Sequence, residues 1–97
     1  MLIRVVRMTF QEEEVSTFLD VFNNSKDKIR AFEGCSHLEL LQDYNQPNIF
    51  MTYSYWQDQE SLNQYRQSAL FGSVWKQTKA LFAAPPVAFS MKKYLTV

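Results

Sequence analysis

Residues Glu33 to Phe71 read EGCSHLELLQDYNQPNIFMTYSYWQDQESLNQYRQSALF, and this stretch decides the fold of the chain. Its first part, Cys35 to Asp43, alternates between side-chain types as a strand does. The next residues, Tyr44 to Asn48, have the composition of a turn. Residues 49–56 are almost all aromatic, β-branched or small, which indicates a further strand. The pattern therefore predicts a β-hairpin.

The second half of the stretch predicts a helix in two pieces. Asp58 is placed to cap a helix whose inward residues are Leu62 and Tyr65. After a break near Ser68, a further apolar stripe at helical spacing consists of Phe71, Val74, Trp75, Thr78 and Phe82. Two prolines at 85–86 predict the end of that helix.

The flanking segments extend this pattern in both directions. Residues 2–10 are rich in apolar and β-branched types and predict a first strand with both faces largely covered. Apolar residues then recur at helical spacing, so we expect an amphipathic helix over residues 11–31 that stops before Gly34. Residues 87–97 alternate again and predict a last strand.

The resulting order is βαββαβ, which predicts one α+β domain over residues 1–97 with a ferredoxin-like, antiparallel sheet. Helices from two crossovers can cover only one face of such a sheet, yet the strands are apolar on both faces. Something else must bury the second face. The simplest candidate is a second copy of the chain, so we expect a homodimer.

Composition excludes several classes of function. Ten basic and ten acidic residues cancel, and no basic stripe could bind nucleic acid or an anionic membrane. No apolar run is long enough for a membrane helix or a signal peptide, so we expect a soluble, cytoplasmic protein. With one cysteine and one histidine, no zinc-binding cluster is present, and we expect no metal site.

The chain resembles the antibiotic biosynthesis monooxygenase domains, a family of small dimeric α+β barrel proteins. The resemblance rests on the Gly34-Cys35 turn, the strand from Pro47 to Trp56, the helix start from Asp58 to Leu62, and Ser68-x-x-Phe71. It implies that two subunits pack sheet to sheet into a shared barrel. It also implies that each subunit keeps a pocket between its own sheet and its helices.

The resemblance further implies a cofactor-independent monooxygenase acting on a small aromatic, quinol or anthrone-like molecule. In such enzymes a deprotonated phenol or enol passes an electron directly to molecular oxygen, and the protein excludes water and orients the ring. Trp56 matches the family tryptophan that borders the substrate. An asparagine that holds the reacting oxygen in the anthrone-type oxygenases corresponds here to Thr52, whose hydroxyl offers one hydrogen bond.

The haem-degrading branch of the same fold is similar around Ser68 to Phe71, but its key positions differ here. Its haem-ligating histidine corresponds to Trp75, and a polar asparagine of its first strand corresponds to Val6. Neither residue can serve those roles. Haem degradation is therefore disfavoured, and no cofactor is expected.

The expected pocket is walled by Trp56, Trp75, Phe71 and Tyr65, and Val6 of the first strand is also expected to line it. Each of these aromatics can equally be an ordinary core residue. His37 is the default general base because histidine alone has an ordinary pKa near neutrality, although a strand histidine is often solvated or part of an interface. Arg4 and Arg7 are expected to pair with carboxylates such as Glu39.

Two other functions remain open at this point. The absence of both family asparagines fits a non-catalytic small-molecule binder or a stress-related dimeric barrel protein. Related barrels that use histidine and tyrosine suggest an isomerase or mutarotase. Oxygen uptake distinguishes the monooxygenase from both alternatives.

Overall fold

The computed structural model describes residues 1–97 and has the predicted βαββαβ order, with the second helix divided into two. The elements are β1 (Leu2–Thr9), the 3-10 turn η1 (Glu12–Glu14), α1 (Val15–Arg30), β2 (Cys35–Gln42), β3 (Ile49–Trp56), α2 (Gln59–Arg66), α3 (Ala69–Lys79) and β4 (Val87–Met91). The predicted α+β class and the break near Ser68 are confirmed.

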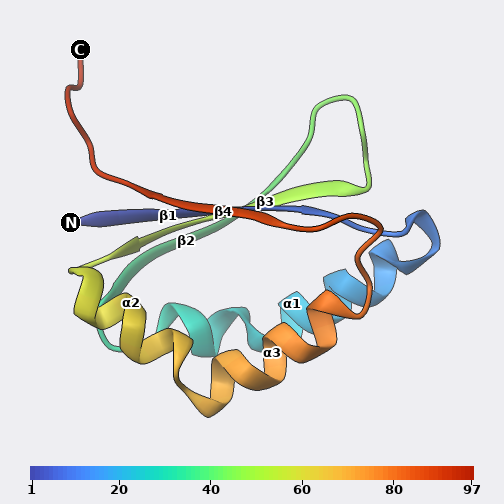
Figure 1. The fold of residues 1–97 in the computed structure, drawn as a ribbon, viewed down its shortest axis with the longest axis horizontal. Coiled ribbons are helices and arrows are strands. Elements are labelled where there is room, and N and C mark those ends of the chain that lie inside the picture. The colour runs from blue at the N-terminus through green and yellow to red at the C-terminus, as the bar shows by residue number, and fades with distance from the viewer.

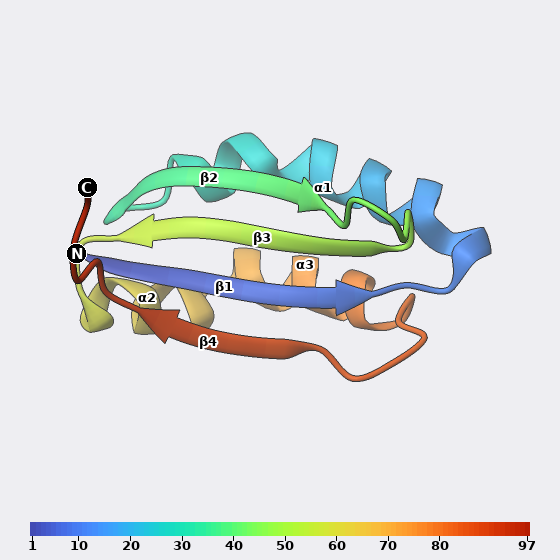
Figure 2. The ribbon, with the colours of Figure 1, turned by 90° about the horizontal axis from the view of Figure 1, so that it is seen from above.

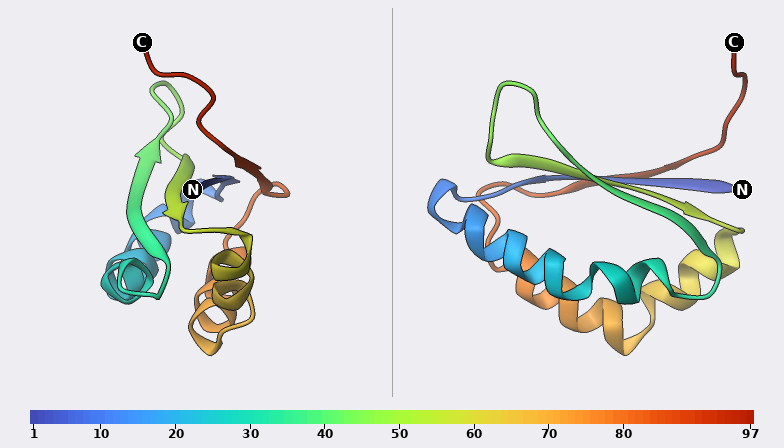
Figure 3. Two further views of the ribbon diagram at one scale, coloured as in Figure 1. Left: turned by 90° about the vertical axis from the view of Figure 1, so that its left-hand side faces the viewer. Right: turned by 180° about the vertical axis from the view of Figure 1, so that it is seen from behind.

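The four strands form one antiparallel sheet in the order β2-β3-β1-β4, which is the ferredoxin-like arrangement. All helices lie on one side of this sheet (Figure 1). The end-on view shows α1 and the α2–α3 pair side by side beneath it (Figure 3). Figure 2 looks onto the opposite face, where no element of the chain covers the strands.

The helix-facing side of the sheet carries two separate core clusters. Near the end of β1, Phe10 stacks on Phe18 of α1 with ring centroids 4.1 Å apart, and Met8 and Phe50 complete this cluster. At the other end of the sheet, Trp56 packs with Cys35 and Leu62. The two clusters fix the helices to the sheet at both ends and leave the middle less filled.

The uncovered face is apolar along its centre and at one edge. Residues of β1 and β3 that alternate away from the helices include Val5, Met51 and Tyr53. On the edge strand β4, Phe89 and Met91 stay 40% and 46% exposed. Such a surface is costly to leave in water, as the sequence pattern predicted.

The helix expected over residues 11–31 is α-helical only over Val15–Arg30, because the 3-10 turn η1 precedes it. Two further boundaries differ from the sequence prediction, and both follow from hydrogen bonding to β1. The last helix ends at Lys79 rather than at the prolines, because Phe82 forms an isolated bridge with Phe10 and Ala83 donates to the carbonyl of Thr9. The last strand ends at Met91 rather than at residue 97, because Met91 already pairs with Ile3 near the start of β1.

No helix is both long and apolar enough to cross a membrane.

Gly34 forms the turn between α1 and β2 and lies against the start of α2. Its φ of 89° is left-handed, and its carbonyl accepts a hydrogen bond of 2.8 Å from the backbone of Gln57. A Cβ at this position would lie 2.5 Å from the side chain of Ser61. Only glycine fits here without moving α2.

We predict that Gly34→Ala lowers the free energy of unfolding by at least about 1–2 kcal/mol, since the left-handed backbone alone costs that much. Gly72→Ala is the matched control, because Gly72 lies in α3 with nothing within 4 Å of the added methyl group. The Gly72→Ala variant should have a free energy of unfolding up to about 1 kcal/mol higher than the wild-type protein. Urea unfolding of both proteins checks the pair, and equal effects would contradict the packing of Gly34 on Ser61.

Candidate active site between the sheet and the helices

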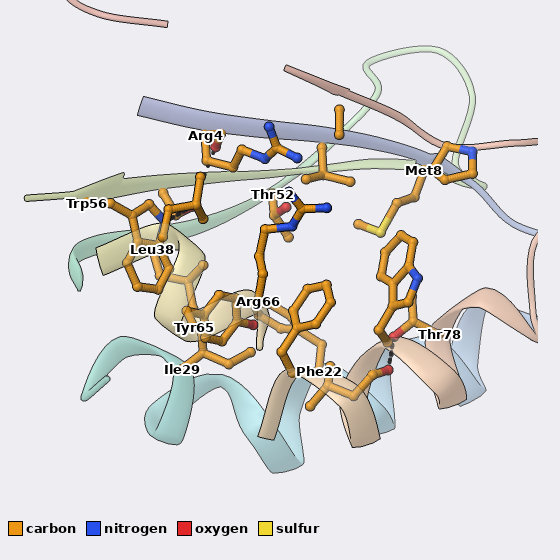
Figure 4. A pocket seen from close by; sticks show the side chains of 18 of the residues that line it. Arg4, Met8, Phe22, Ile29, Leu38, Thr52, Trp56, Tyr65, Arg66 and Thr78 are labelled. Carbon is orange, nitrogen blue, oxygen red and sulfur yellow. Dashed lines mark hydrogen bonds between the residues drawn. The ribbon is translucent and has the colours of Figure 1, made fainter. Parts of the chain in front are cut away.

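A cavity of about 230 Å³ lies between the middle of the sheet and the helices, in the gap between the two core clusters (Figure 4). Of its 19 lining residues, 13 are hydrophobic. Mostly apolar walls with a few polar groups are typical of small-molecule sites. The volume is below the roughly 300–1,000 Å³ of drug-sized pockets, so the site suits a small ligand.

Small side chains of neighbouring strands form the sheet side of the cavity. Val6 of β1 pairs with Thr52 on one side and with Ala88 on the other. The next helix-facing position, Arg4, is flanked by Ser54 and Ser90. Because these neighbours are short, the helices above them do not reach the sheet and a space remains.

Aromatic rings of α2 and α3 form the opposite wall. Tyr65 meets Phe71 edge to face at 5.2 Å, and Phe71 stacks on Trp75 at 5.8 Å with an interplanar angle of 11°. Trp75 in turn contacts Phe82 at 5.6 Å. The rings form a continuous, rigid surface over the cavity. The four aromatics of the expected pocket, Trp56, Trp75, Phe71 and Tyr65, all line this cavity.

Ser68 explains why two of these rings keep their places. Its hydroxyl donates to the carbonyl of Tyr65 at 2.6 Å and accepts from the backbone N–H of Phe71 at 3.1 Å. One side chain thus ends α2 and caps α3. The Ser68-x-x-Phe71 spacing therefore serves to position Tyr65 and Phe71 on the cavity wall.

Trp56 lines the cavity but is 1% exposed, and its ring belongs to the core. Its indole N–H donates to the hydroxyl of Ser54 at 3.0 Å, so it has no donor left for a ligand. The ring stacks on Tyr65 with centroids 4.8 Å apart. Trp56 therefore acts as a wall that orients Tyr65.

Tyr65 and Thr52 provide the free hydroxyl groups of the cavity. Burial raises the pKa of the Tyr65 phenol well above its usual value, so the group stays protonated and can donate a hydrogen bond. Thr52 faces it from the sheet (Figure 4), beside Val6. Neither hydroxyl is bonded to another residue, which leaves both available to a ligand.

The structure does not bring His37 to this cavity. His37 follows the alternation of β2 onto the uncovered face, where its Nε2 lies 3.4 Å from a carboxylate oxygen of Glu39 and its ring lies 4.8 Å from that of Tyr55. The whole sheet separates it from the cavity. A general-base role for His37 in this pocket has no geometric support.

Sequence reasoning missed two arginines of the cavity lining, Arg4 and Arg66. The expected pairing of Arg4 with Glu39 is wrong: Arg4 lies on the helix-facing side and donates to Ser90 at 3.0 Å, whereas Glu39 contacts His37 on the other face. The alternation of side chains along the first strand could have shown that Arg4 lies in the cavity. It placed Arg4 on the same covered face as Val6 and Met8, with no carboxylate on that face.

Nowhere do three side chains of the His, Cys, Asp or Glu types converge as metal ligands. At the positions that correspond to the haem-binding residues of related proteins, Trp75 and Val6 both line the cavity. An indole and an isopropyl group cannot ligate iron. These two positions therefore supply neither the histidine nor the polar amide of the haem-degrading branch.

Comparisons with known proteins agree with this architecture. Solved structures that superpose closely include a conserved protein from Methanosarcina mazei Go1, with a TM-score of 0.90, 22% identity and coverage of 97% of this chain and 94% of that one. An antibiotic biosynthesis monooxygenase superposes with a TM-score of 0.92 at 18% identity, with coverage of 98% of this chain and 100% of that one. A candidate antibiotic biosynthesis monooxygenase from Nitrosomonas europaea superposes with a TM-score of 0.90 at 13% identity, with coverage of 98% of this chain and 100% of that one. At these identities the likeness shows the fold alone.

None of the curated proteins matches the sequence. The sequence profile of the antibiotic biosynthesis monooxygenase family, however, matches residues 1–77, which include β1 to α2 and most of α3. This match covers most of the chain and all but three of the cavity-lining residues, which are Thr78, Pro86 and Ala88. The chain therefore belongs to the antibiotic biosynthesis monooxygenase family.

Proposed function

We propose that the chain is a monooxygenase that uses molecular oxygen, without a bound cofactor, to oxidise a small aromatic, quinol or anthrone-like molecule. The observation that carries the proposal is the cavity itself, which combines an aromatic wall with the unpartnered hydroxyls of Tyr65 and Thr52. The family match supports the reaction class. Cofactor independence follows from the resemblance to family members whose substrates supply the electrons.

The proposed chemistry needs no external reductant. The deprotonated substrate transfers one electron to oxygen, which gives a substrate radical and superoxide. The two recombine into a carbon–oxygen bond, and the peroxide anion takes up one proton from solvent, which balances the proton that the substrate lost. The resulting hydroperoxide loses water and leaves a carbonyl group. One oxygen atom thus enters the substrate and the other leaves in water, while the substrate is oxidised from a methylene or C–H to a carbonyl.

The residues of the cavity supply orientation, hydrogen bonds and a dry environment. The rings of Phe71 and Trp75 fit against a flat substrate, and Tyr65 can donate to the oxygen atom on which charge develops. No carboxylate or imidazole lines the cavity. In this proposal the substrate proton therefore goes to solvent, and the positive charges of Arg4 and Arg66 favour the deprotonated substrate.

Oxygen uptake with a panel of hydroquinones and anthrones, in the presence of a metal chelator, tests the proposal. We expect uptake above the spontaneous rate for at least one substrate. Tyr65→Phe and Thr52→Val remove the hydroxyls at nearly constant volume and should each lower kcat by about tenfold or more. A flat trace for the whole panel would contradict the proposal.

The controls separate chemistry from folding. Tyr44→Phe removes the hydroxyl of a tyrosine that is 99% exposed in the β2–β3 turn, and it should leave uptake unchanged. Trp56→Ala is a poor choice, since deleting a buried tryptophan typically costs about 3–5 kcal/mol of stability, and a loss of activity would then not separate chemistry from unfolding. Substrate loss without oxygen uptake would instead identify an isomerase. That alternative lacks a histidine in the cavity, because His37 lies on the other face.

We also propose that the uncovered face of the sheet joins two chains into a homodimer. Its exposed apolar side chains include Leu41, Val87, Phe89 and Met91, and the helices of the same chain cannot reach them. A stable pair of this kind should bury roughly 2,000 Å² or more in total. The resemblance to dimeric barrel proteins supports the second copy as the partner.

Phe89→Asp should weaken the dimer at least about 100-fold, because it places an unpaired charge in an apolar interface. Thr17→Asp is the control; it adds the same charge at an exposed position of α1, on the opposite side of the molecule. Light scattering coupled to size-exclusion chromatography checks both variants. A wild-type protein that is monomeric at micromolar concentration would refute the homodimer.

A further inference from the structure

Two positively charged side chains enter the same cavity from opposite walls. Arg4 comes from β1 in the sheet and Arg66 from the last turn of α2, and Figure 4 shows their guanidinium groups directed toward each other. Neither has a carboxylate partner. Only His37 and Glu39 bring a basic and an acidic side chain into contact, and they lie on the other face of the sheet.

This arrangement is unfavourable in the empty protein. Arg4 is half-buried, and its pKa is lowered first by burial and then by the positive charge of Arg66. Burial and a like charge both oppose the charged form of a side chain that nevertheless stays protonated. An anion between the two groups would remove both penalties. Unbalanced charges of one sign in a cavity are a mark of a binding site.

The local structure holds Arg4 in place for such a contact. Its Nη1 donates to the hydroxyl of Ser90, which is its direct neighbour across β4. Ser54, the neighbour on β3, is short and leaves the space above Arg4 open. A guanidinium carries five N–H donors, so most of them remain available after the bond to Ser90.

The surroundings favour a carboxylate over a phosphate. Phosphate sites usually include free backbone N–H groups at a helix start. Of the first three residues of α3, only Phe71 lines the cavity, and its N–H is already bonded to Ser68. Two guanidinium groups beside a mostly apolar wall instead match a planar carboxylate attached to a ring.

We propose that the substrates of this pocket are small hydroxylated aromatic carboxylates, with the carboxylate between Arg4 and Arg66 and the ring against Phe71 and Trp75. The inference rests on the proposed use of the same pocket for an aromatic substrate, and it specifies the chemical class of that substrate. In this position the ring hydroxyl faces the free hydroxyls of Tyr65 and Thr52. The arginines thus select and orient the molecule while the hydroxyls contact its reacting end.

Calorimetric titration with matched acids and amides tests this inference without turnover. One pair is 1-hydroxy-2-naphthoate and 1-hydroxy-2-naphthamide, and a smaller pair is salicylate and salicylamide. Each amide keeps the shape of its acid and lacks the charge. Because charged hydrogen bonds are stronger than neutral ones, we expect the wild-type protein to bind at least one acid about tenfold or more tightly than its amide.

Arg66→Met and Arg4→Met should each abolish most of this preference, because each weakens the binding of the acid and leaves the affinity for the amide nearly unchanged. Arg66 lies on the surface end of α2, so its replacement is compatible with folding even if the variant at Arg4 is unstable. Lys26→Met is the control. It removes one positive charge from an exposed site of α1, where Lys26 donates a hydrogen bond to Asn23, and it should preserve the preference.

The outcomes distinguish this inference from the proposed function. Equal binding of acid and amide, binding of neither, or a preference that survives Arg66→Met would overturn the carboxylate site. The oxygen-uptake assay with neutral hydroquinones is a separate measurement. Acid-selective binding without any oxygen uptake would retain the carboxylate site and reject the monooxygenase.

Discussion

A four-stranded sheet has two faces, and the two crossover connections of this chain supply helices for only one of them. The rest of the structure depends on that constraint. On the covered face, the helices create a core and enclose a cavity. On the other face, Phe89 and its apolar neighbours remain exposed, and this exposure is the basis of the proposed dimer. The separation of the faces also separates the side chains into two chemical environments, which the alternation of each strand determines residue by residue.

The cavity results from the distribution of side-chain size along the covered face. Large residues gather at its two ends, around Phe10 and around Trp56, and hold the helices away from the sheet. Between them the strands carry short residues such as Thr52 and Ser54, so the helices pass above the middle without filling it. Two hydroxyls and two guanidinium groups remain without strong partners in that space. These polar groups make the cavity a chemical site and not simply a packing defect.

The sequence predicted the fold closely because the relevant signals are local. The run of aromatic, β-branched and small residues defined β3 to its ends, and the change of apolar spacing near Ser68 marked the break between α2 and α3. The ends of α3 and β4 depended instead on distant partners in β1, which no local pattern reveals. The site was predicted in part. The aromatic wall followed from the resemblance, but the role of Arg66 required knowing that the end of α2 faces the sheet, and His37 was assigned without knowing which face the helices cover.

The most direct test of the two-faced arrangement uses the four methionines of the chain as reporters. Met8 lines the cavity, Met51 and Met91 lie on the uncovered face, and Met1 is exposed at the N-terminus. Methyl NMR spectra of protein labelled with ¹³C at the methionine methyl groups can follow a titration with 1-hydroxy-2-naphthoate. The account predicts that the Met8 signal shifts while the signals of Met51 and Met91 stay unchanged. Shifts of Met51 or Met91 with an unmoved Met8 would place the ligand on the wrong face of the sheet and contradict the account.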